Sequence, residues 1–174
     1  MHIRLEDKKN RCAASGFTII EIIMVLVIIG ILAMTALPRF ASFYMIKFNG
    51  ALKVITEHIR YVQQIAISKH TNCRVVFNAI NETYIAQEES PQGTNTWAAI
   101  TDPFTRAGLT VNFRTDPYYN GINITVANFG GTPTLRFNWE GIPQNATGVN
   151  LTSDGMVNFI YKGNNNTLSI SPNT

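Results

Sequence analysis

At 174 residues and a formal net charge of +3, the chain has room for one compact domain plus a membrane anchor, but not for two ordinary domains. The charge is uneven, because the first sixteen residues hold four basic and two acidic side chains, whereas the remainder holds ten basic and nine acidic ones. The pI near 9.0 therefore comes largely from a short N-terminal segment, and it gives no general argument for nucleic-acid binding.

The polar leader, residues 1–16, ends in the small residues Ala13 to Gly16, directly before an apolar run. A secretory signal has its small-residue cleavage site after the apolar stretch, and here the order is reversed. A cut after Gly16 would therefore keep the apolar segment in the mature protein.

The apolar run, residues 17–37, has the sequence FTIIEIIMVLVIIGILAMTAL and carries one charge, Glu21, before Pro38. As a helix it would extend roughly 31 Å, which matches a hydrocarbon core of about 30 Å. The basic leader places the N-terminus in the cytoplasm by the positive-inside rule. We therefore predict a single-pass inner-membrane protein whose C-terminal domain is periplasmic.

The string Gly16-Phe17-Thr18-Ile19-Ile20-Glu21 before an apolar helix resembles the signal of type IV prepilins and type II secretion pseudopilins. The resemblance implies that a prepilin peptidase cuts between Gly16 and Phe17 and methylates the new amine of Phe17. It also implies partners of three kinds, namely other pilin or pseudopilin subunits, that peptidase and an inner-membrane assembly platform.

Glu21 is costly in a membrane, because an ionised side chain costs about 2.5 to 3.5 kcal/mol at the bilayer centre and less near its edge. No Lys or Arg occurs between Phe17 and Pro38. Cleavage would create a positive amine on Phe17, one helical turn away, on this chain or a neighbour. We hypothesise that Glu21 sets the axial register during assembly; the alternative is a glutamate tolerated at the headgroup level.

Pro38 removes a backbone donor and disfavours helix at Leu37, so we expect a helix kink or local melting there. The resemblance implies that the helix near this proline can unwind in an assembled filament. A simple kink is the alternative.

Residues 38–72 are predicted to continue the helix in amphipathic form as far as about Ser68. Polar residues separate apolar ones spaced three or four apart, which indicates one buried face. The apolar positions are Leu52, Ile55, Ile59, Val62 and Ala66.

Residues 73–174 alternate with period two and contain many turn residues, which predicts a β-rich domain and an α+β fold with the long helix on small antiparallel sheets. Turns are expected at Asp154-Gly155 and in the run Gly163 to Asn166. The predicted strands are Arg74 to Asn78, Thr83 to Gln87, Leu109 to Arg114, Ile122 to Val126, Thr134 to Asn138, Val149 to Thr152, Met156 to Tyr161 and Thr167 to Ser171.

The helix running into Arg74-Val75-Val76-Phe77, and Leu135 to Asn138 followed by Gly141-Ile142-Pro143, resemble the GspH/FimT group of minor pilins and H-type pseudopilins. Some FimT-like proteins take up DNA through basic C-terminal tails. This chain ends in Pro172-Asn173-Thr174, and its late basic residues Arg136 and Lys162 are isolated in sequence, so nucleic-acid binding is not expected.

Catalytic and metal motifs are not found in the sequence, and we expect neither an enzyme nor a cofactor or metal. Once the leader is lost, Cys73 has no second cysteine to pair with, and no histidine lies at ligand spacing from it. Four aromatic residues could form a docking surface, although a place in the β core is the favoured interpretation. They are Trp97, Tyr118, Tyr119 and Trp139.

Three functions remain open. The favoured one is a structural subunit of a type II secretion pseudopilus or a type IV pilus, assembled through its N-terminal helix at or near the tip. The second is a binding module at the tip for DNA or a secreted substrate, and the third is a membrane-tethered enzyme. The sequence does not choose between secretion and pilus machinery.

Overall fold

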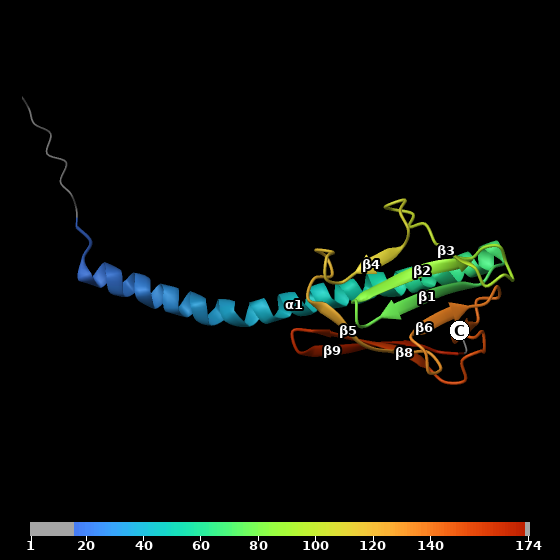
Figure 1. Ribbon diagram of the computed structural model, residues 1–174. Coiled ribbons are helices and arrows are strands. Elements are labelled where there is room, and N and C mark those ends of the chain that lie inside the picture. Colours follow the sequence, from blue (N-terminus) through green and yellow to red (C-terminus); the bar gives the residue numbers. More distant parts are fainter. Residues whose placement is uncertain (1–15, 173–174) are drawn as a thin grey trace, which may run out of the picture. The chain divides into compact units, whose positions relative to one another are not determined.

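A computed structural model of the chain describes residues 16–172, with the backbone alone for residues 35–42 (Figure 1). The leader therefore lies outside the described residues except for Gly16. The helix α1 spans Ile19–Lys69 and precedes all the strands. The chain divides between Phe43 and Tyr44 into two compact units.

The second unit contains the C-terminal part of α1 and two antiparallel sheets. In the larger sheet the strand order is β3-β2-β1-β6-β7, with β4 also paired to β2; in the smaller one it is β5-β8-β9. This arrangement, a helix packed on antiparallel sheets, confirms the predicted α+β class. The strands are β1 Cys73–Asn78, β2 Thr83–Glu89, β3 Trp97–Ala99, β4 Thr110–Asn112, β5 Ile122–Asn128, β6 Thr134–Phe137, β7 Pro143–Gln144, β8 Gly155–Tyr161 and β9 Asn164–Ile170.

The amphipathic stripe of α1 forms one side of the core, as predicted. All five of its predicted apolar positions between Leu52 and Ala66 are buried. In β1 burial alternates, so that Cys73, Val75 and Phe77 lie in the core while the residues between them are half-buried. In Figure 1 the C-terminal half of α1 runs behind β1 and β2. Burying each large apolar side chain contributes about 1.5 to 3 kcal/mol.

Contacts between aromatic rings join the two sheets into one core. Phe77 of β1 lies 5.7 Å from Phe129, and Phe113 lies 5.8 Å from Phe159 of β8, measured between ring centroids. All four side chains are at most 2 % exposed. Every buried apolar side chain that the structure describes lies between Phe48 and Tyr161, so the second unit holds its own core.

Several short elements differ from the sequence prediction. The predicted strand Val149 to Thr152 is wrong, because only an isolated bridge between Gln144 and Asn150 forms there. The strands β3 and β7 were not predicted, since each has three residues or fewer and no period can be seen over that length.

The predicted turn Gly163 to Asn166 is also partly wrong. Lys162 and Gly163 have φ values of 48° and 81°, and they alone form the loop between β8 and β9. Two residues with positive φ fit the twist of a tight hairpin, so pairing starts at once with Tyr161 opposite Asn164. The asparagines therefore belong to β9.

The aromatic residues do not all lie in the core as favoured from the sequence. Tyr119 is buried, but Tyr118 is 47 % and Trp139 46 % exposed, and Trp97 is half-buried. Trp139 stacks on the ring of His70 at 5.9 Å, and Trp97 stacks on an arginine. Polar and cationic partners thus hold the two tryptophans at the surface.

Candidate N-terminal processing and assembly site

The residues around the predicted cleavage bond lie before the helix. Gly16, Phe17 and Thr18 have no regular secondary structure, and α1 begins at Ile19. Phe17 is 77 % exposed. A Cβ added to Gly16 would meet nothing within 4 Å. The fold itself therefore does not require glycine at this position.

Thr18 caps the helix, and Glu21 follows at capping-box spacing. The Glu21 N–H donates to the Thr18 carbonyl at 3.1 Å and lies 3.4 Å from the Thr18 hydroxyl. A carboxylate in the first turn is also favoured by the helix dipole. Sequence reasoning missed this local role of Glu21, although the spacing Thr18-x-x-Glu21 was the signal that could have shown it.

The apolar segment presents its side chains outward in the single chain. Each described side chain from Gly16 to Met34 is exposed. Phe17, Glu21 and three apolar neighbours line a hollow of about 300 Å³ on this surface. A continuous apolar surface of this extent is typical of segments that bind lipid or other protein chains.

Within the part of the chain that the structure describes, no helix combines the length and apolarity needed to cross a membrane.

Pro38 lies within α1, whose backbone is helical from Ile19 through to Lys69. The predicted kink, and the unwinding implied for an assembled filament, both stay predictions. Gly30 has open space around it, since a Cβ there would meet nothing within 4 Å.

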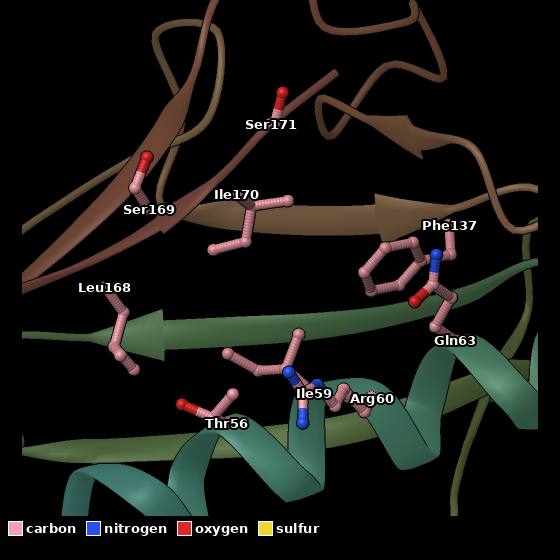
Figure 2. A pocket seen from close by; sticks show the side chains of 9 residues that line it. All are labelled: Thr56, Ile59, Arg60, Gln63, Phe137, Leu168, Ser169, Ile170 and Ser171. Atoms are coloured by element: carbon pink, nitrogen blue, oxygen red, sulfur yellow. The ribbon is translucent and has the colours of Figure 1, made fainter. Parts of the chain in front are cut away.

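A groove of about 270 Å³ lies in the second unit, between α1, β6 and the end of β9 (Figure 2). Its apolar lining comes from Ile59, Phe137, Leu168 and Ile170, and Figure 2 shows Leu168 and Ile170 pointing toward α1. The polar lining is largely engaged, because Gln63 donates to the Gly141 carbonyl at 2.8 Å and Arg60 pairs with Glu57 at 3.1 Å. The groove thus offers contact area rather than reactive groups.

Burial shifts the pKa values of two titratable groups near the core, Cys73 and His58. Burial raises the pKa of the Cys73 thiol to about 12, so it stays protonated and unreactive at neutral pH. His58 Nδ1 lies 2.6 Å from the Tyr84 hydroxyl, and burial lowers the pKa of this histidine. Among the described residues, no group of three or more His, Cys, Asp or Glu side chains is placed to hold a metal ion.

Comparison with known proteins identifies the N-terminal segment. Residues 11–37 match the prokaryotic N-terminal methylation motif, a signal sequence like that of type IV pilins. The match confirms the signal predicted from Gly16 to Glu21. It implies a membrane-anchored N-terminus, processing by a prepilin peptidase and assembly with other pilin subunits. The chain matches no curated protein and no solved structure.

Proposed function

We propose that the chain is a minor pilin or pseudopilin of the GspH/FimT group, a structural subunit at or near the tip of a type II secretion pseudopilus or a type IV pilus. The observation that carries this proposal is the N-terminal methylation motif over residues 11–37. The pilin-like arrangement of a long helix on antiparallel sheets supports it. The role is assembly, not catalysis.

Processing is the first step of this function. A prepilin peptidase cuts between Gly16 and Phe17 and methylates the Phe17 amine. Exposure of Phe17 and the absence of helix at both residues support access to this bond. Because a Cβ at Gly16 meets open space, the requirement for glycine there comes from the peptidase and not from the chain.

Assembly through the N-terminal helix is the second step. The exposed apolar side chains from Phe17 to Met34 first lie in the inner membrane and then pack against neighbouring subunits. Glu21, held in the first turn of α1, pairs with a Phe17 amine and so fixes the axial position of a subunit. An ionised acid in an apolar bundle needs such a partner.

The proposed subgroup rests on sequence resemblance, which includes the turn Gly141-Ile142-Pro143. Gly141 has a φ of 83°, and a Cβ there would lie 2.7 Å from Ile67 Cδ1 of α1. The glycine therefore serves a defined packing role between β6, the helix and β7. This turn belongs to the sequence phrase that resembles the GspH/FimT group.

Mass spectrometry of the native protein tests the proposal. We expect a mature chain that starts at Phe17 and carries one methyl group on its amine. Gly16→Val should block processing, whereas Gly30→Val, also in open space, should leave it intact. An intact first methionine, or a cut beyond Leu37, would refute the assignment.

The choice between the two machines needs a cellular experiment. Deleting the gene and measuring protein secretion, twitching motility and DNA uptake side by side separates them. Loss of secretion alone indicates a pseudopilus, and loss of twitching or uptake indicates a pilus. Loss of none of these contradicts the proposed role.

A further inference from the structure

Two arginines that are far apart in sequence lie side by side on the larger sheet. Arg74 of β1 and Arg136 of β6 are directly opposite each other in the antiparallel register. Arg74 is half-buried, and the Arg136 side chain is 16 % exposed. Because β1 alternates between core and surface, both arginines lie on the sheet face that points away from the core residues Cys73 and Val75. Arg136 was isolated in sequence but is not isolated in the fold.

Trp97 of β3 extends over this pair. The Arg74 guanidinium carbon lies 4.0 Å from the centre of the Trp97 ring, and that of Arg136 lies 5.5 Å from it. The indole N–H is held by the Asn95 side chain at 3.1 Å. Trp and Arg together are the residues most enriched at binding hot spots, because they combine large contact area with hydrogen bonding.

The cluster contains more positive than negative charge. Glu89 contributes a carboxylate to the cluster, and the Glu89 side chain is 3 % exposed. Burial opposes ionisation of Glu89, but hydrogen bonds from Asn72 and from the Asn95 and Gly93 backbones, with the charge of Arg136, lower its pKa overall. Glu89 is therefore ionised at neutral pH and offsets one of the two guanidinium charges.

Among the described residues, neither arginine donates a hydrogen bond to a carboxylate. Arg136 Nη2 lies 3.9 Å from Glu89 Oε2, which is too long for a hydrogen bond. Its buried Nε–H has no hydrogen-bond acceptor in the described structure. Arg74 donates to the neutral Gln87 amide at 2.8 Å, and no described carboxylate lies within 4.0 Å of it. Burial, and then the neighbouring Arg136 charge, lower the pKa of Arg74.

We propose that Arg74 and Arg136, with Trp97 beside them, bind an oxyanion, either a carboxylate or a phosphate group. The anion offsets the excess guanidinium charge, and the planar guanidinium fork can donate two parallel N–H hydrogen bonds to the oxygens of either group. The buried Nε–H of Arg136, which has no acceptor among the described residues, would be satisfied by such an anion. Trp97 lies beside both guanidinium groups on the three-residue edge strand β3, so an anion bound to them would contact its ring. The site does not depend on the N-terminal signal or on filament assembly.

Trp97 itself reports on the site. Trp97 and Trp139 are the two tryptophans of the chain, so Trp139→Phe leaves Trp97 as the single tryptophan, which is excited selectively at wavelengths that the six tyrosines do not absorb. The full chain in detergent is titrated with inorganic phosphate and, separately, with acetate, each balanced with chloride to constant ionic strength. We expect a saturable change in Trp97 emission with at least one ion. The ion that binds more tightly identifies the group.

Arginine variants decide whether the response belongs to this site. Arg74→Gln and Arg136→Lys should each weaken the binding at least fivefold, because one removes a charge and the other removes the planar fork. Arg60→Gln, an exposed arginine on α1, should leave the affinity unchanged. Circular dichroism and thermal unfolding check that each variant is folded. A non-saturable response, or equal affinity in Arg74→Gln and the Arg60→Gln control, would overturn the proposal.

Discussion

The segment from Gly16 to Met34 and the unit from Tyr44 onward are both rich in apolar side chains, but they use them in opposite ways. In the first, every described side chain is exposed, and the residues form a helix with an N-terminal cap. In the second, helix and strands bury their apolar faces against one another. The second unit is therefore stabilised by its own packing, whereas the first depends on lipid or other subunits.

Truncating a large side chain in the core should lower the free energy of unfolding far more than truncating one in the exposed segment. Phe159→Ala removes a fully buried ring that contacts Phe113, and it should lower the free energy of unfolding by about 3 to 5 kcal/mol. Leu26→Ala, at a side chain 62 % exposed, should not change the unfolding of the second unit. Urea denaturation followed by tyrosine and tryptophan fluorescence measures both. Equal costs would contradict the separation of the two units.

Replacing a glycine by alanine should also destabilise the second unit but not the exposed segment. A Cβ at Gly155 would overlap the ring of Phe129, so Gly155→Ala should destabilise the protein by about 1 to 3 kcal/mol. The matched control is Gly30→Ala, where a Cβ meets open space. Thermal unfolding compares the two variants. An unchanged midpoint for Gly155→Ala would show that the core can adjust around this position.

The cap at Thr18 stabilises the start of α1. Thr18→Ala should destabilise the start of α1 by about 1 kcal/mol, because the hydroxyl no longer reaches the Glu21 N–H. Amide hydrogen exchange of Ile19 to Ile22 in detergent micelles measures this fraying. The control Thr56→Ala removes a hydroxyl bonded to the Leu52 carbonyl inside the helix. Faster exchange at Ile19 to Ile22 in that control as well would remove the case for a specific cap.

The smallest effect should be the pH dependence that comes from His58. Burial lowers its pKa in the folded state below the ordinary value of 6.5, so the unfolded chain binds the proton more readily. The contribution of this residue to stability is therefore complete above pH 6.5 and is lost as the pH falls through the lowered pKa. Thermal unfolding at pH 5 to 8 should show a weaker dependence for His58→Gln. A steeper dependence would show that another group dominates.

The parts of the molecule that were predictable from sequence are those fixed by local patterns. The signal from Gly16 to Glu21 is contiguous, and the stripe from Leu52 to Ala66 repeats over four turns, so both were visible. The pairing of Arg74 with Arg136 could not be predicted, because it depends on the register between β1 and β6, which are separated by 55 residues of sequence.

The surface tryptophans could not be predicted for a related reason. Composition favours a buried Trp, but Trp97 and Trp139 are held outside the core by Arg74 and His70. Those partners are brought near by tertiary contacts and not by sequence neighbours. The short strands β3 and β7 are likewise defined by the strands beside them.

The start of α1 at Ile19 has a consequence for maturation. A protease must thread its substrate through the catalytic cleft with the backbone accessible, and cutting inside a helix would first require several hydrogen bonds to be broken. The proposed scissile bond before Phe17 lies two residues ahead of the first helical residue, and Thr18, which would stay with the product, provides the cap. Cleavage at this proposed bond would therefore not require α1 to unwind, and the new terminus would arise beside a helix that is already formed.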